Sequence, residues 1–323
     1  MRLIEKMLSK RNMELAIKKV KSNKGAPGVD NMMVEEIDKY FEIHGEEIIT
    51  AIMNMKYKPK PVRRVYIPKA DGKQRPLGIP TVTDRVIQQA LAQILSEIYE
   101  PHFSENSYGF RPNRSAHNAM EQVLEYLNEG YEWVIDIDIE KYFDTVHHDK
   151  LISILREHVN EREILHLIRS FLKAGVMEDG LVSPNEAGVP LSPVLSNIYL
   201  DKLDKELEER GLRFVRYADD GNIFVKSEMA AERVMKSITW WLERKLFLKV
   251  SATKTKIVRP TKSNFLGFTF WKGSMGWKCR PSDNRKAKLC MKIKEILKRK
   301  HAVARPLAET FKRINQIIRG WIN

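Results

Sequence analysis

The chain has 323 residues, of which 43% are hydrophobic and 30% are charged, and its formal net charge is +14 at pH 7. This composition is typical of a globular protein and excludes a disordered chain. No apolar run reaches the roughly 18 residues that a membrane-spanning helix needs, and no signal-peptide segment follows Met1. The two cysteines, Cys279 and Cys290, form neither a zinc motif nor a disulfide framework. We therefore expect a cytoplasmic protein with no membrane partner.

Two segments carry the positive charge. Residues 278–323 have a net charge of +11, residues 56–75 have a net charge of +7, and the remainder of the chain has −4. Two basic blocks on a mildly acidic body indicate a polyanion that is held at two places. The alternative for each block is an ordinary solvated basic surface.

The first 130 residues predict helices and one hairpin. Periodic apolar positions indicate helices at 12–56, with a break at the turn-rich NKGAPGVD, and then at 84–99 and 116–127. Ser115 is the expected N-cap of the last helix. The segment 61–68 reads as a strand, and the Asp71-Gly72 turn followed by LGIP predicts its return strand.

The segment 131–139, YEWVIDIDI, is the clearest strand of the sequence. Its odd positions from Trp133 to Ile139 are apolar, whereas Asp136 and Asp138 alternate with them on the other face. This strand is therefore expected to be largely buried, with carboxylates on one face.

A helix and a second hairpin follow. Ser192 and Pro193 open a helix as N-cap and first residue, and the helix runs to about Glu209 before Gly211. In FVRYADDGNIFV, residues 214–225, an Asp-Gly pair between apolar runs predicts a hairpin turn.

The remaining segments are a helix at 228–246, strand-like LKVS, KIVRP and NFLGFTF, and a basic helical region from about 284. Strands that alternate with helices, with clear hairpins among them, indicate an α+β fold with a mostly antiparallel sheet.

Three carboxylates could share one site. If the strand ending at Asp138 neighbours the hairpin that bears Asp219 and Asp220, these acids converge. Two like charges about 4 Å apart repel by a few kcal/mol near a protein surface, and divalent cations offset that cost. Mg²⁺ prefers carboxylate and phosphate oxygens, and paired ions serve phosphoryl transfer. The alternative is that Asp-Asp-Gly is only turn chemistry.

YADD between apolar runs resembles the active-site hairpin of reverse transcriptases, and further segments match that family in order. These are RRVYIPKADGKQRPLGIPTVTDRVIQQAL (63–91), SYGFRPNRSAHNA (107–119), DIDIEKYFDTVHHDKL (136–151), LSPVLSNIYLDKLDKEL (191–207), LKVSATKT (248–255) and NFLGFTF (264–270). NKGAPGVD and the terminal INQIIRGWIN are similar to bacterial group II intron reverse transcriptase–maturases rather than retroviral enzymes.

The resemblance implies a polymerase right hand with fingers and palm, whose antiparallel palm sheet is flanked by helices. Residues 1–130 would form an N-terminal extension and the fingers, with finger strands at about 61–80. Residues 131–275 would form the palm, with some fingers helices interleaved. Residues 276–323 would be a basic helical segment that leads to a thumb/maturase domain.

The family's catalytic roles fall on matching positions. Asp138 and Asp219 match the metal-binding carboxylates, and the Ile139 carbonyl matches a further ligand. Asp220 matches the second hairpin aspartate. The implied cofactor is a pair of Mg²⁺ ions, with Mn²⁺ as the alternative.

Four further residues match nucleotide-binding positions. Phe143 matches the bulky residue that would clash with a ribose 2′-OH, with core packing as the alternative. Lys69 and Arg75 match fingers residues that hold the incoming triphosphate. Lys254 matches a lysine proposed to protonate pyrophosphate, with a solvated lysine as the alternative.

RNA contacts are expected from arginines beside the matched blocks, namely Arg63, Arg64, Arg111 and Arg114. Such contacts make the affinity fall steeply with salt. His147 and His148 match no metal cluster, and with Asp149 they are expected to start a helix.

The implied function is RNA-directed DNA polymerisation of the group II intron type, in a protein that binds intron RNA and also assists splicing. The partners would be intron and template RNA, a DNA primer and dNTPs, with a homodimer left open. The alternative is an RNA-binding maturase fragment with little or no polymerase activity. A metal nuclease or cyclase on a similar palm is disfavoured by the complete fingers segment.

The sequence departs from the family pattern at two places. The family reads GxPQGGPLSP before the helix at 193–209, whereas this chain reads GVPLSP at 188–193 and lacks Gln-Gly-Gly. The chain also stops at IRGWIN, which resembles the opening of the thumb. We therefore expect a truncated protein whose synthesis is weak and distributive.

Overall fold

The computed structural model describes the chain except for residues 69–73, 141, 179–180, 184–190 and 323. Its helices are α1 (Leu3–Leu8), α2 (Lys10–Ser22), α3 (Ile37–Met53), α4 (Val82–Tyr99), α5 (Ala116–Asn128), α6 (Tyr142–Thr145), α7 (His148–Leu155), α8 (Arg162–Lys173), α9 (Ser192–Glu209), α10 (Glu228–Lys245), α11 (Asp283–Leu297), α12 (Arg299–Ala302) and α13 (Leu307–Ile322). Its strands are β1 (Val62–Pro68), β2 (Gln74–Ile79), β3 (Trp133–Ile137), β4 (Val176–Glu178), β5 (Leu181–Ser183), β6 (Arg213–Tyr217), β7 (Asp220–Val225), β8 (Lys256–Val258), β9 (Asn264–Phe265), β10 (Phe268–Gly273) and β11 (Gly276–Pro281).

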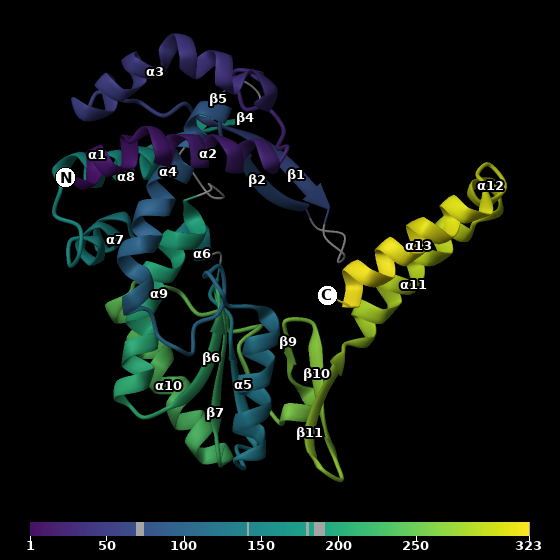
Figure 1. Cartoon of the computed structure of the whole chain (residues 1–323). Coiled ribbons are helices and arrows are strands. Elements are labelled where there is room, and N and C mark those ends of the chain that lie inside the picture. Colours follow the sequence, from purple (N-terminus) through teal and green to yellow (C-terminus); the bar gives the residue numbers. More distant parts are fainter. Residues whose placement is uncertain (69–73, 141, 179–180, 184–190, 323) are drawn as a thin grey trace.

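The sheet that carries the carboxylates has the strand order β6-β7-β3-β8, and every neighbouring pair is antiparallel. One face packs against α9 and α10 through Ile135, Ile223 and their neighbours. The other face packs against α5 and the β9–β11 sheet through Val134 and Phe224 (Figure 1). The predicted α+β fold, an antiparallel palm sheet flanked by helices, is confirmed.

A second sheet has the order β2-β1-β4-β5. β1 and β2 form the predicted hairpin, with Pro68 opposite Gln74. β4, which the sequence analysis did not predict, pairs in parallel with β1 through Val62 and Val176. In Figure 1 this sheet lies with α1–α3 and α8 at the opposite end of the molecule from the tips of β10 and β11.

Helix α4 connects these two regions, and its start is built around a buried carboxylate. Thr81 is its N-cap and accepts a hydrogen bond from the Asp84 N–H, while the Thr81 hydroxyl donates to the Asp84 carboxylate at 2.7 Å. Tyr57 also donates to this carboxylate at 2.8 Å. The segment before β1 is thereby fixed to the first turn of α4.

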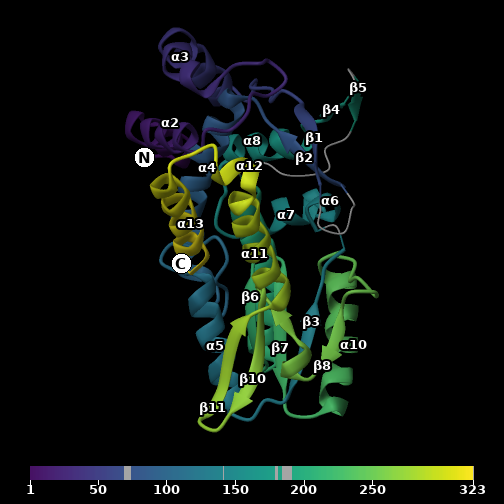
Figure 2. The same cartoon turned by 90° about the vertical axis from the view of Figure 1, so that its right-hand side faces the viewer.

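The C-terminal region forms a three-stranded sheet, β11-β10-β9, followed by a helical arm. β11 was not predicted. Helices α11 and α13 lie side by side in both views and project away from the palm sheet (Figures 1 and 2). None of the helices in the described part of the chain is long and apolar enough to cross a bilayer.

Most predicted boundaries agree with the structure. Ser115 caps α5 through the Asn118 N–H, and His147 caps α7 through the Lys150 N–H. Helix α9 starts one residue earlier than predicted, since Leu191 and not Ser192 is its N-cap. The expected strand at LKVS is wrong, because there Val250 makes only an isolated bridge with Ile139.

Candidate active site

The hairpin that bears Asp219 and Asp220 joins β6 and β7 through a two-residue turn. Tyr217 pairs with Asp220, so the turn residues are Ala218 and Asp219. Ala218 adopts a left-handed conformation, with φ of 58°. The predicted turn at Asp220-Gly221 is therefore wrong: the strand register places Asp220 in β7 and the turn one step earlier in the chain.

Asp138 and Asp220 face each other at the end of the palm sheet. Ile137 pairs with Gly221 across β3 and β7, and the next step of this antiparallel register brings Asp138 opposite Asp220. Directly opposed residues present their side chains on the same face of a sheet. Asp219 follows in the adjoining turn, so all three predicted carboxylates lie at one end of β3, β6 and β7.

The electrostatics of this end show an excess of negative charge. Desolvation by the surrounding protein raises the pKa of Asp220, the negative charges of Asp219 and Asp138 raise it further, to about 6, and Lys254 opposes the shift. Asp220 is nevertheless an exposed residue, so part of it is in contact with solvent. Lys254 places its Nζ 3.1 Å from both carboxylate oxygens of Asp138.

The carboxylates match a divalent metal ion in their chemistry more than in their present spacing. In the described part of the chain, no group of three or more His, Cys, Asp or Glu residues is close enough to hold one as the side chains stand. The carboxylates still provide the oxygen chemistry that hard divalent cations prefer. Desolvation raises the pKa of Asp220 most, and the mutual repulsion that raises it further is what a cation would relieve.

Asp136 has a different environment from Asp138, although both alternate on the same face of the strand. Its carboxylate accepts hydrogen bonds from Asn222 at 2.5 Å and from Ser263 at 3.1 Å, and Lys256 lies 3.5 Å away. Burial raises its pKa, and Lys256 opposes that shift. Asp136 therefore ties β3 to β7 and to the segment before β9.

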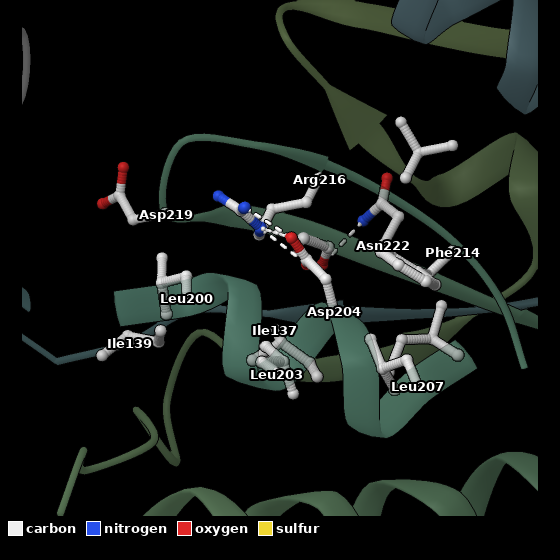
Figure 3. Close-up of a pocket in the computed structure, with 13 residues that line it drawn as sticks. Ile137, Ile139, Leu200, Leu203, Asp204, Leu207, Phe214, Arg216, Asp219 and Asn222 are labelled. Carbon is white, nitrogen blue, oxygen red and sulfur yellow. Dashed lines mark hydrogen bonds and ion pairs between the residues drawn. The ribbon is translucent and has the colours of Figure 1, made fainter. Parts of the chain in front are cut away.

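A buried ion pair under the hairpin was not predicted. The side chains of Arg216 in β6 and Asp204 in α9 are 2% and 0% exposed and pair at 2.5 Å (Figure 3). The signal was present in the sequence: Arg216 stands in a strand that is apolar at its neighbouring positions, and Asp204 follows Leu200 and Leu203 on an apolar helix face. A charge at such a position requires a buried partner.

The predicted nucleotide-binding residues are only partly described. Lys69 lies outside the described residues. Arg75 is in β2 opposite Ile67, and Phe143 is in α6, but their side chains are outside the described part. The segment with the missing Gln-Gly-Gly also falls largely outside it, at 184–190.

The predicted RNA-binding arginines are placed in different environments. Arg63 and Arg64 are consecutive residues of β1, so they point to opposite faces of the finger sheet. Arg114 is 23% exposed, pairs with Glu105 and lies over the Tyr108 ring.

The expectation for Arg111 as an RNA contact is wrong in this structure. Its side chain is 3% exposed and pairs with Glu100 at 2.9 Å. It also donates to the carbonyl oxygens of Ser104 and Ser107 at 2.5 and 2.8 Å. Arg111 folds the loop between α4 and α5, because its donors are all directed into the protein.

The family follows from comparison with known proteins. The model of the family described as "Reverse transcriptase (RNA-dependent DNA polymerase)" matches residues 67–270, and the chain belongs to this family. Members of the family act on nucleic acids and use divalent metal ions.

Two curated relatives indicate which class of reverse transcriptase the chain resembles. The chain is 35% identical to protein YkfC of Escherichia coli over 280 residues, which cover 73% of this chain and 74% of YkfC. It is 39% identical over 207 residues to the group II intron-encoded protein LtrA of Lactococcus lactis, covering 62% of this chain but only 34% of LtrA. These findings confirm the predicted class, an RNA-directed DNA polymerase of the group II intron type.

A solved structure supports the fold independently. Apo telomerase from Candida tropicalis, truncated from its C-terminal domain, superimposes with a TM-score of 0.53 at 13% identity, covering 69% of this chain and 55% of that chain. At this identity the likeness concerns the fold alone.

Proposed function

We propose that this chain extends a DNA primer on an RNA template by adding deoxynucleotides. The primer 3′-hydroxyl gives its proton to water and its oxygen forms a bond to the α-phosphorus of the dNTP. The bond from that phosphorus to the oxygen that bridges it to the β-phosphate breaks, and pyrophosphate leaves. The observation that carries the proposal is the meeting of Asp138, Asp219 and Asp220 at one end of the palm sheet.

In this proposal Asp138 and Asp219 would hold two Mg²⁺ ions, with the Ile139 carbonyl as a further ligand. When bound, such ions stabilise the attacking and leaving oxygens of the displacement. Asp220 adds negative charge beside them and binds less directly. The register of β3 against β7 keeps the carboxylates together before any cation binds.

The remaining nucleotide contacts are assigned from matching positions. Lys69 and Arg75 would hold the triphosphate, and Phe143 would exclude a ribose 2′-OH. Lys254 would give its proton to the departing pyrophosphate, since its ammonium group already lies beside Asp138.

We assign residues 1–130 to the N-terminal extension and fingers, 131–275 to the palm, and 276–323 to a basic helical segment. Arg63, Arg64 and Arg114 are proposed RNA contacts, whereas Arg111 is not.

A second function, anchoring intron RNA during splicing, is favoured by the helical arm. A groove between α11 and α13 is lined by Arg285, Lys288, Lys292 and Trp321. Cations bind phosphates, and an indole ring stacks on bases. This function does not exclude polymerisation.

Primer extension with Mg²⁺, dNTPs and an RNA template tests the proposal. Asp219→Ala should abolish incorporation and leave RNA affinity, measured by filter binding, nearly unchanged. The matched control is Asp149→Ala, which removes an exposed aspartate of α7 that pairs with Arg169 and should retain activity. Incorporation by Asp219→Ala at the wild-type rate would contradict the polymerase proposal. Strong RNA binding without incorporation by the wild type would favour the anchoring function.

A further inference from the structure

Arg216 uses every donor of its guanidinium group inside the palm, and Figure 3 shows the bonds to Asp204. Its Nε donates to Asp204 at 2.7 Å, and its Nη2 donates to Asp204 at 2.5 Å and to Ser107 at 2.8 Å. Its Nη1 donates to Asn197 at 3.0 Å and to the Ala218 carbonyl at 2.8 Å. An arginine has five N–H donors, so no other side chain can replace this set of contacts.

One of these bonds reaches the catalytic turn. The Ala218 carbonyl belongs to the peptide that links Ala218 to Asp219, and this peptide follows the left-handed residue of the turn. A non-glycine residue in that conformation persists only when its surroundings determine it. The Arg216 bond to Ala218 therefore fixes the peptide group that orients Asp219.

The loop between α4 and α5 supports the turn from its other side. The backbone N–H of Arg216 donates to the Asn106 carbonyl at 2.9 Å, and the backbone N–H of Tyr108 donates to the Arg216 carbonyl at 2.9 Å. A Cβ built on Gly109 would lie 2.3 Å from the Ala218 nitrogen, so backbone lies directly against backbone. Asn197 completes the contact by donating to the Gly109 carbonyl at 2.8 Å.

We propose that Arg216 is a positioning residue for nucleotidyl transfer, which holds the turn so that Asp219 meets a metal ion together with Asp138. The proposal rests on the polymerase function proposed above. It assigns to the buried pair of Arg216 and Asp204 a role in the geometry of the metal site in addition to any role in stability.

Stability alone is a poor explanation of this pair. Burying two charges carries a large desolvation cost, and replacing a buried ion pair by apolar residues of similar volume is often neutral or stabilising. An apolar pair could fill the space between β6 and α9, but it could not bind the Ala218 carbonyl. This difference allows stability and positioning to be separated by mutation.

The experiment compares Arg216→Met/Asp204→Leu, Arg216→Lys and the wild-type chain. The double variant removes both charges, whereas Arg216→Lys keeps the positive charge beside Asp204 but has three donors instead of five. Arg210→Met is the control, because Arg210, the C-cap residue of α9, pairs with Glu206 of that helix and donates to Ser237 of α10 rather than to the turn. Each protein is assayed below its unfolding midpoint, measured by circular dichroism.

The first readout is Mn²⁺ affinity of the nucleotide-free protein, followed by electron paramagnetic resonance. The second is kcat and KM for dNTP in primer extension. Partners that orient metal ligands typically contribute about 10- to 100-fold to affinity or activity. We expect losses of this size in Mn²⁺ affinity and kcat for both Arg216 variants, with KM nearly unchanged and Arg210→Met like the wild type.

A folded double variant with wild-type Mn²⁺ affinity and kcat would overturn the proposal. Failure of both variants to fold would also count against it, because Arg216 would then serve the fold rather than the turn. If the wild type binds Mn²⁺ but does not incorporate dNTPs, the polymerase proposal fails. The comparison of Mn²⁺ affinities would still test the positioning role.

Discussion

The Lys254 ammonium lies 3.1 Å from each of the two carboxylate oxygens of Asp138. These are the same oxygens that the proposed site offers to a divalent cation. Lys254 and a metal ion therefore compete for Asp138, and the lysine is its counter-ion when no metal is bound. The pair is largely accessible to water, with the two side chains 69% and 34% exposed, so its contribution is modest.

Removing this competitor should strengthen metal binding. We expect Lys254→Met to bind Mn²⁺ about two- to five-fold more tightly in the absence of nucleotide, the size expected for an exposed ion pair. Isothermal titration calorimetry measures the change. Lys249→Met is the matched control, since Lys249 makes a similarly exposed pair with Glu140 at 3.2 Å and should leave the affinity unchanged. Weaker binding by Lys254→Met would contradict the competition.

Gly109 should not tolerate a side chain. Because its added Cβ would lie 2.3 Å from the Ala218 nitrogen, Gly109→Ala must displace backbone, and we expect it to lower the free energy of unfolding by about 1–3 kcal/mol. Urea denaturation measures this. Gly221→Ala, in the hairpin against which Gly109 packs, is the control, since an added Cβ there meets no described atom within 4 Å. Equal stability of the two variants would rule out close packing at Gly109.

Asp201 should make stability depend on pH. Desolvation and the negative charge of Asp204 raise its pKa to about 6, above the ordinary value near 3.8. The folded chain then holds this proton to higher pH than the unfolded chain, so the stability contributed by Asp201 falls as pH rises from about 4 to 6.

The variant Asp201→Asn removes this dependence and keeps an oxygen for the Ser104 N–H, which now donates to Asp201 at 3.3 Å. We expect its unfolding midpoint to exceed that of the wild type by an amount that grows between pH 4 and pH 7. Differential scanning calorimetry across this range measures it, and a constant difference would contradict the raised pKa.

The basic segment before β1 should contribute to RNA affinity through phosphate contacts. Lys56 and Lys58 are exposed, and replacing both by Gln should weaken binding to all single-stranded RNA sequences alike. Each lost phosphate contact should reduce the slope of log K against log salt by about 0.7. Lys236→Gln, at an exposed position of α10, is the control. An unchanged salt slope would exclude the segment from the RNA site.

Sequence patterns predicted those elements whose local signals agree with their tertiary surroundings. The alternation from Trp133 to Ile139 correctly assigned the two faces of β3, since Ile135 and Val134 enter different clusters of the core. The register that places Asp138 opposite Asp220 could not be read from either segment, because it depends on where the turn falls. Because Ala218 adopts a left-handed conformation, the turn lies at Ala218 and Asp219 rather than at the predicted Asp220-Gly221 pair.

Arginine environments were the least predictable part of the site. Arg111 and Arg114 are three residues apart in one loop, yet the first is buried and the second is partly exposed. Loop sequence carries little information on which side faces the protein. Arg216 could have been recognised as buried from its apolar neighbours, but its partners come from two other segments and required the structure.

The pairing of β4 with β1 has a consequence for how the protein is made. Val176 must arrive before Val62 gains its second neighbouring strand, and one continuous cluster of buried side chains extends from Ile4 in α1 to Val250 beyond α10. When only the first 130 residues have left the ribosome, the sheet β2-β1-β4-β5 therefore still lacks β4 and β5, and the shared core is incomplete. These first 130 residues should remain incompletely folded, and exposed to chaperones and proteases, until the middle of the chain emerges.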